Sequence, residues 1–131
     1  KSIDRAMVDT AQNTGMILTI ALNYGGQAEI LDAVKALAME VKQGVLSVDE
    51  ITQDSFEQRL TTAILPEAYR NPDFVIRTSG ENRLSNFLPW QTAYSELYFT
   101  ETLWPDFDEA ALDLAFDVFS QRDRRYGGIK K

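Results

Sequence analysis

The sequence contains neither cysteine nor histidine. These absences exclude disulfide bonds, thiol nucleophiles, imidazole general bases and the usual zinc ligands. Any catalysis by this chain therefore has to rest on carboxylates, arginines and hydroxyl groups, or on a hard cation such as Mg²⁺, which prefers oxygen ligands.

The sequence also lacks long apolar runs and an excess of positive charge. Residues 16–22 form a nearly apolar run of only seven residues, whereas a membrane span needs about 20, so we expect no transmembrane helix, and no signal peptide is apparent. The net charge of −7 argues against general electrostatic binding to nucleic acid. Five of the thirteen basic residues nevertheless lie in the last ten positions.

The length and the hydrophobic content predict a folded chain. With 131 residues, 44% of them hydrophobic, the chain is long enough for one domain or part of one. It has no initiator Met and opens on Lys1 in what reads as the middle of a helix. We therefore interpret residues 1–131 as a single domain that is a fragment of a longer protein.

Residues 73–99 combine a strand with a donor-rich turn. Residues 74–76 are β-branched or aromatic, typical of a buried strand. The polar turn that follows contains Arg77 and Arg83, and the planar fork of arginine suits phosphate oxygens. In open α/β sheets, ligands bind outside the carboxyl ends of the strands, where this turn would lie. The alternative is that both arginines are surface residues paired with Glu81 or another acid.

The second half of this stretch predicts a helix and a further strand. Ser85 or Asn86 could cap a helix that starts near Phe87. A lone acid, Glu96, then precedes the apolar run 97–99, which we expect to be a strand. Five apolar residues between these features either form core or line a cavity for an apolar chain: Phe87, Leu88, Trp90, Ala93 and Tyr94.

The N-terminal part predicts a strand, a glycine turn and a helix. Residues 16–23 are expected to form an interior parallel strand. Gly25 and Gly26 turn the chain, either as a weak phosphate loop or to let strand and helix pack tightly. The helix that follows should end near Gly44. Its expected buried stripe is Ile30, Leu31, Val34, Leu37, Ala38 and Val41.

Shorter helices are expected on both sides of the central stretch. Ser47 with Glu50, and Asp54 with Glu57, suggest capping pairs for helices over residues 48–53 and 55–62. A last helix should begin after Asp108, with Arg122, Arg124 and Arg125 at its end, where their charge complements the helix dipole. Its expected buried stripe is Ala111, Leu112, Ala115, Phe116 and Phe119.

The central stretch resembles the C-terminal signature of the cis-prenyltransferases, the family of undecaprenyl diphosphate synthase. The resemblance spans residues 13–128. The matching pieces are residues 76–81 (IRTSGE), 83–88 (RLSNFL), 90–91 (WQ), 93–99 (AYSELYF) and 103–107 (LWPDF). The resemblance implies an α/β fold in which a mostly parallel β-sheet is wrapped by helices, with the N-terminal part of that fold missing from this chain.

The resemblance also implies an activity. Members condense isopentenyl diphosphate with an allylic, farnesyl-type diphosphate, with Mg²⁺, to make a long cis-polyprenyl diphosphate such as undecaprenyl diphosphate, a lipid carrier for cell-wall synthesis. It implies a cytoplasmic homodimer with sites shared across the interface, with peripheral contact to the inner face of the membrane through the lipid product. From the net charge of −7, and independently of the resemblance, we expect no nucleic acid partner.

Residue by residue, the resemblance assigns substrate and metal roles. Arg77, Arg83 and Ser85 would bind isopentenyl diphosphate, and Arg125 with the Gly127 N–H would reach the same diphosphate from the neighbouring subunit. The resemblance implies that Glu96 helps to coordinate Mg²⁺.

The chain departs from the family pattern in three places. The loop that carries the family's catalytic aspartate does not occur, so no catalytic residue is assigned and we expect the fragment alone to be inactive. Gln27 stands where relatives carry arginine, and Asn82 where they often carry histidine.

Two alternatives belong to other classes. A non-catalytic partner subunit would be expected to have lost the arginines and the carboxylate that this chain keeps. An unrelated phosphate-binding module would bind many phosphate anions without preferring an isoprenoid.

Overall fold

One pair of parallel strands organises the computed structural model, which describes residues 2–122. Strand β1 (Phe74–Arg77) pairs with β2 (Glu96–Phe99) so that Phe74 lies opposite Glu96 and Arg77 opposite Phe99. Both strands were expected, and their parallel pairing confirms the α/β class. The turn after β1 is fastened to the chain after β2, since the Gly80 N–H donates to the Thr100 carbonyl over 2.9 Å.

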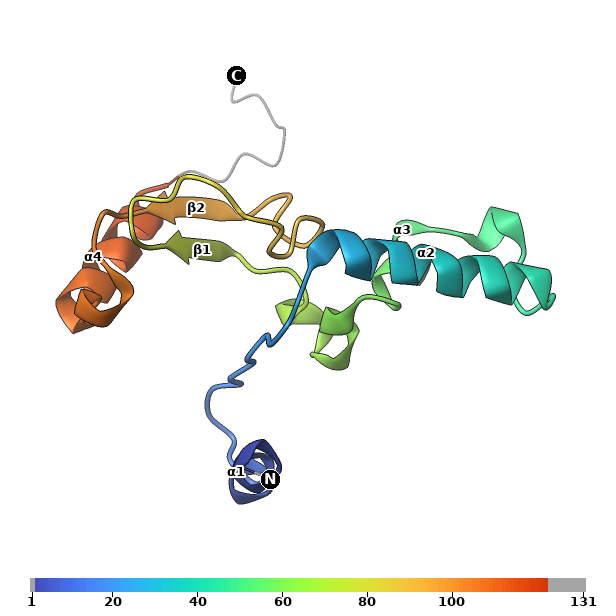
Figure 1. Cartoon of the computed structure of the whole chain (residues 1–131), viewed down its shortest axis with the longest axis horizontal. Helices are drawn as coiled ribbons and strands as arrows, with labels where there is room; N and C mark the ends of the chain where they lie inside the picture. The colour runs from blue at the N-terminus through green and yellow to red at the C-terminus, as the bar shows by residue number, and fades with distance from the viewer. Residues whose placement is uncertain (1, 123–131) are drawn as a thin grey trace.

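Helix α4 (Glu109–Ser120) packs against this pair, at the end of the molecule away from α2 (Figure 1). The expected cap is confirmed, because Asp108 Oδ1 accepts from the Ala111 N–H over 2.9 Å. The Phe119 ring lies 4.6 Å from the Phe74 ring of β1. The expected stripe is partly wrong: Ala115 is buried, but Phe116 is 50% exposed, although its ring lies 6.3 Å from the Phe74 ring.

Helix α2 (Gly26–Lys42) and the short helix α3 (Gln53–Glu57) form the other end of the molecule (Figure 1). They are tied by a half-buried ion pair between Arg59 and Glu40, in which Arg59 Nε donates to Glu40 Oε1 over 3.1 Å. Short 3-10 helices lie between these elements: η1 (Val48–Glu50), η2 (Thr61–Ile64), η3 (Glu67–Tyr69) and η4 (Trp104–Asp106).

The capping predictions between α2 and β1 were half right. Ser47 and Glu50 form the expected capping box at η1. The second box is made by Thr52 and Ser55 and not by the predicted acidic pair, so α3 starts earlier and is shorter than expected. Gly44 ends α2 with a φ of 72°, as its position after the helix predicted.

The buried face of α2 differs from the expected apolar stripe. The buried positions are Gly26, Glu29, Ala33 and Leu37, which repeat every three or four residues along one line of the helix. Leu31 and Val34 were expected to be buried but are 53% and 48% exposed, because no other described element covers their side of the helix. A charged residue, Glu29, therefore sits where the apolar pattern predicted none.

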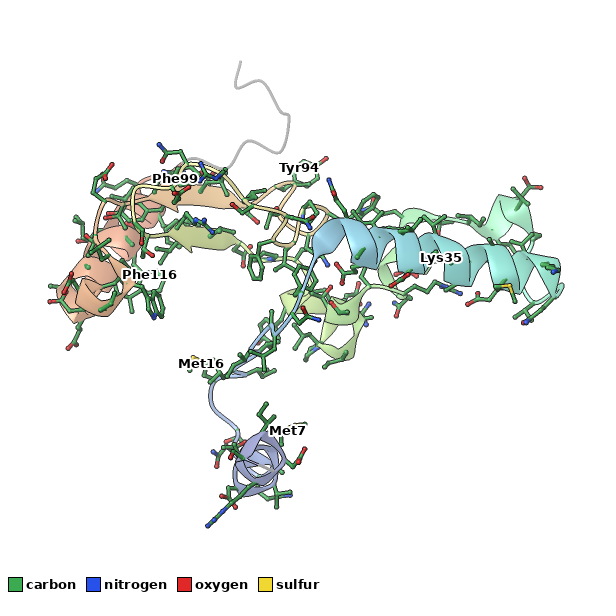
Figure 2. The ribbon with its side chains drawn as sticks, in the orientation of Figure 1. Met7, Met16, Lys35, Tyr94, Phe99 and Phe116 are labelled. Atoms are coloured by element: carbon green, nitrogen blue, oxygen red, sulfur yellow. The ribbon has the colours of Figure 1, made fainter. Side chains whose placement is uncertain are left out.

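The strand predicted for residues 16–23 is wrong. These residues form an extended segment that leads from α1 (Ser2–Thr10) to α2, and Met16 and Leu18 are 86% and 73% exposed (Figures 1 and 2). A strand needs a neighbour that takes up its backbone hydrogen bonds, and the described part of the chain places no strand beside this segment. Between residues 2 and 122, no helix is both long and apolar enough to cross a membrane.

The helix expected from Phe87 is also wrong, since residues 84–94 form a series of turns, here called the 84–94 loop. Ser85, Asn86 and Leu88 have φ values of 49°, 66° and 47°. Such left-handed conformations are incompatible with a right-handed helix and are uncommon for residues other than glycine. The loop therefore follows its contacts with other segments and not its helical periodicity.

Candidate functional site

A cleft of about 320 Å³ opens at the carboxyl end of β1. Its walls come from the strand, from the turn after it and from the start of the 84–94 loop. The lining residues are Val75, Ile76, Arg77, Thr78, Ser79, Glu81, Arg83, Leu84 and Phe87. The cleft lies where α/β sheets bind ligands, and two of the residues predicted to bind a diphosphate line it.

Arg77 and Ser85 meet at the edge of this cleft. Arg77 is half-buried at the last position of β1, and its Nη2 lies 3.5 Å from Ser85 Oγ. Ser85 reaches this position through its left-handed backbone conformation. The guanidinium and the hydroxyl thus present donors from two segments to one small volume, a pattern suited to an anion with several oxygens.

Arg83 lines the same cleft and forms an ion pair with Glu81. This is the surface pairing that the sequence left open as the alternative. The Arg83 side chain is 69% exposed, and exposed ion pairs are weak, typically below about 1 kcal/mol. An anion entering the cleft can therefore compete with Glu81 for the guanidinium.

Glu96 is set apart from these residues. It is the first residue of β2 and lies level with Phe74, whereas Arg77 is three positions further along the paired strand, or about 10 Å at the strand rise. Its carboxylate accepts from Arg122 Nη1 over 2.7 Å and does not line the cleft. The structure therefore places Glu96 at the opposite end of the strand pair.

These positions do not make a magnesium site by themselves. Within residues 2–122, no group of three or more acidic, histidine or cysteine side chains is arranged to hold a metal ion. Glu96 offers one carboxylate, which Arg122 already neutralises. The described residues therefore do not fit a bound Mg²⁺ without further ligands.

Of the other positions singled out in the sequence, Asn82 is exposed beside the cleft. The Gln27 N–H is used within the fold, since it donates to Asn86 Oδ1 over 2.8 Å. Arg125 and Gly127 lie outside the described residues.

Behind the cleft, the buried carboxylate of Glu29 joins three segments. It is 8% exposed and accepts hydrogen bonds from the Tyr24 hydroxyl (2.5 Å), the Thr61 N–H (2.7 Å) and Gln91 Nε2 (3.2 Å). Tyr24 in turn packs edge-on against Phe87, with ring centroids 5.7 Å apart. Glu29 thus ties α2 to η2 and to the 84–94 loop.

These contacts set the protonation of the network. Burial alone would raise the pKa of the Glu29 carboxyl, but the hydrogen bonds from Thr61, Tyr24 and Gln91 together lower that pKa below its ordinary value. Burial, with the hydrogen bond to Glu29 and the negative charge there, raises the pKa of the Tyr24 hydroxyl. At neutral pH, Glu29 is therefore an ionised acceptor and Tyr24 a neutral donor.

Sequence reasoning missed three of these residues in the roles they take. Glu29 was recognisable as an acid in line with Ala33 and Leu37, four and eight positions later. Arg122 was attributed to helix electrostatics but pairs with Glu96. Asn86 was one of two candidate caps for the segment that follows it, whereas it caps α2, a contact 59 residues away in sequence that no local pattern shows.

The family described as "Putative undecaprenyl diphosphate synthase" matches residues 1–127. The chain belongs to this prenyltransferase family. This confirms the resemblance identified in the sequence.

An isoprenyl transferase of Streptococcus mutans serotype c is 56% identical over 128 residues, which are 98% of this chain and 51% of that protein. The chain spans about half the length of the curated relatives it matches.

Two solved structures are similar to this fold. A lavandulyl diphosphate synthase from Lavandula x intermedia, in complex with dimethylallyl diphosphate, is 40% identical with a TM-score of 0.90, over 96% of this chain and 52% of that one. A probable undecaprenyl diphosphate synthase from Campylobacter jejuni is 28% identical with a TM-score of 0.74, over 95% and 54%. Both confirm the predicted α/β fold, of which this chain is about half.

The Glu29 network predicts a pH-dependent loss of stability. In the Glu29→Gln variant, the free energy of unfolding should fall by about 1–3 kcal/mol at pH 7, because a buried charge-assisted hydrogen-bond hub is removed. The folded pKa of Glu29 lies below its ordinary 4.5, so this stabilisation is present above pH 4.5 and is lost as the pH falls through the folded pKa. Urea titrations of both proteins between pH 7 and pH 3 measure the difference.

The matched control for this test is Asp32→Asn, which removes the same charge from an exposed position of α2. It should change the unfolding free energy by less than about 0.5 kcal/mol at every pH. A difference between wild type and Glu29→Gln that stays constant down to pH 3 would contradict the assigned ionisation.

Proposed function

We propose that the encoded protein condenses isopentenyl diphosphate with an allylic diphosphate and builds a long cis-polyprenyl diphosphate such as undecaprenyl diphosphate. The support is membership of the prenyltransferase family together with isoprenyl transferase relatives above 50% identity. Because the chain spans half of those relatives, the substrates and the product of the whole protein are part of the proposal.

The observation that carries the proposal is the cleft at the carboxyl end of β1. It brings Arg77 within 3.5 Å of Ser85 and places Arg83 on the same wall. These are three of the residues that the resemblance assigns to isopentenyl diphosphate. A diphosphate in the cleft would receive charge-assisted hydrogen bonds from two guanidinium groups and one hydroxyl.

The reaction breaks the C–O bond between the allylic group and its diphosphate and forms a carbon–carbon bond to isopentenyl diphosphate, which then loses a proton. The pyrophosphate that leaves carries the developing negative charge. In this proposal the two arginines hold the diphosphate of the attacking substrate and fix its double bond in position, so the rate gain from this half of the site comes from orientation. Mg²⁺ would stabilise charge on the phosphate oxygens.

Among residues 2–122, the resemblance assigns one candidate Mg²⁺ ligand. Glu96 could become a ligand if Arg122 releases it, and the remaining ligands would have to come from diphosphate oxygens and from residues other than those described. We therefore propose magnesium binding only for the encoded protein and not for residues 2–122 alone.

We also propose that two copies of the protein share their sites. Arg125 and Gly127 are the residues that the resemblance assigns to the neighbouring subunit's diphosphate. They follow in sequence Arg122, which lies two residues beyond the end of α4 and donates to Glu96 of β2. An enzyme organised in this way needs both subunits for one complete site.

Removing Arg83 tests the substrate assignment. In the encoded protein, Arg83→Ala should weaken isopentenyl diphosphate binding by about 1.5–3 kcal/mol, the worth of a hydrogen bond to a charged group. The effect should fall in the lower half of that range, roughly tenfold in Kd, because the side chain is exposed. Binding of the allylic diphosphate should change little, and isothermal titration with each substrate measures both.

The control for Arg83→Ala is Arg5→Ala, which removes an arginine from an equally local ion pair, with Asp9 on α1, far from the cleft. It should leave both affinities unchanged. Equal weakening of both substrates by Arg83→Ala would show that Arg83 is assigned to the wrong subsite.

Mixing two inactive variants tests the shared site. Arg77→Ala and Arg125→Ala should each be nearly inactive in radiolabelled turnover with both substrates and Mg²⁺. Statistical exchange makes about half of the dimers mixed, each with one intact site of two, so activity should return to roughly a quarter of wild type. If mass spectrometry shows exchange and activity stays at the level of the single variants, Arg125 serves its own subunit.

A further inference from the structure

We propose that Asn86 is the positioning residue of the diphosphate cleft: it fastens the 84–94 loop to the N-terminus of α2 and thereby holds Ser85 beside Arg77. The inference rests on the proposed function for the identity of the ligand. The anchoring itself rests on contacts between segments 59 residues apart.

Asn86 takes the place of a helix cap for α2. The residue that precedes the helix, Gly25, has no side chain with which to cap it. Instead, the Asn86 carbonyl accepts from the Gly26 N–H over 2.9 Å, and Asn86 Oδ1 accepts from the Gln27 N–H over 2.8 Å. Two amides that a helix normally leaves unpaired are thus bonded by one residue of a distant loop.

The same contacts explain why α2 does not act as a phosphate loop. The amides of Gly26 and Gln27 are occupied by Asn86, and a Cβ on Gly26 would lie 2.0 Å from Pro89 Cδ. The glycine pair therefore allows the loop to pack closely against the helix. Of the two roles that the sequence left open, tight packing is favoured over a phosphate loop.

Asn86 also maintains an unfavourable backbone next to it. Ser85 and Asn86 occupy the two central positions of a turn that Phe87 closes by donating to the Leu84 carbonyl over 3.0 Å, and both have positive φ. Asparagine tolerates this conformation, whereas serine is disfavoured in it. Such a conformation persists where surrounding contacts fix it, and the bonds to α2 are contacts of this kind.

Ser85 depends on that conformation for its place in the cleft. Its hydroxyl lies 3.5 Å from Arg77 Nη2 while its backbone turns through a φ of 49°. Without the Asn86 carboxamide, the turn loses its side-chain bond to α2 and Ser85 can relax to negative φ, which moves the hydroxyl away from Arg77. Asn86 itself does not line the cleft, so it acts through Ser85.

Two substitutions separate the carboxamide from the backbone. Asn86→Gly keeps the positive φ and the carbonyl but removes Oδ1. Asn86→Asp keeps an acceptor at that atom, and a carboxylate is favourable at a helix N-terminus. The control is Asp108→Ala, which removes a side-chain N-cap of the same kind from α4 and does not touch the loop.

The experiment uses the encoded protein and three readouts: amide hydrogen exchange at Gln27, the KM for isopentenyl diphosphate with kcat, and the thermal unfolding midpoint. For Asn86→Gly we expect about tenfold faster exchange at Gln27 and a KM raised about tenfold with a smaller change in kcat, in line with the loss of one cap. In Asn86→Asp, the exchange rate at Gln27 and the KM should both be close to the wild-type values. Asp108→Ala should lower the midpoint by a similar amount and leave KM within about twofold.

The proposal is overturned if Asn86→Gly leaves KM within twofold of wild type, or if Asp108→Ala raises KM as much as Asn86→Gly does, since the role would then be general stability. If the wild-type protein does not bind isopentenyl diphosphate, the proposed function fails and the substrate part of this inference fails with it. Faster exchange at Gln27 in Asn86→Gly would still support the anchoring of the loop, and unchanged exchange would overturn it.

Discussion

The structure depends on one buried carboxylate. Glu29 sits on the inner face of α2, is 8% exposed, and accepts hydrogen bonds from three other parts of the chain. A buried charge without such partners would cost several kcal/mol, so each donor must be held in place for the helix to pack there. The same hydrogen bonds also fix the positions of the donors, Tyr24, Thr61 and Gln91.

The cleft is built outward from this point. Gln91 and the Tyr24–Phe87 contact hold the 84–94 loop against α2, and Asn86 closes the same junction at the helix N-terminus. Ser85 of this loop therefore lies at the carboxyl end of β1, next to Arg77, the last residue of the strand. The donors that we assign to a diphosphate are therefore set by packing behind the cleft, which is the kind of preorganisation on which binding of a charged substrate depends.

The sequence correctly predicted the features that depend on neighbouring residues. The strands from Phe74 and Glu96, the cap at Asp108 and the C-terminal glycine of α2 follow from residue types and short spacings. The strand predicted for residues 16–23 failed because a strand requires a neighbour, and the helix predicted near Phe87 failed because long-range bonds impose left-handed turns there. Of the site, Arg77, Arg83 and Ser85 were predicted and lie together. The pairing of Glu96 with Arg122 depends on the docking of α4, which sequence spacing does not show.

The central claim is that the cleft recognises an isoprenoid diphosphate and not phosphate anions in general. A competition titration measures this most directly: the encoded protein is saturated with labelled isopentenyl diphosphate, and inorganic pyrophosphate or unlabelled isopentenyl diphosphate is added. The account predicts that pyrophosphate displaces the label at least about tenfold less effectively, because it lacks the apolar group whose burial adds roughly 0.8 kcal/mol per CH₂. Equal displacement by the two competitors would contradict the account and indicate a general phosphate-binding module.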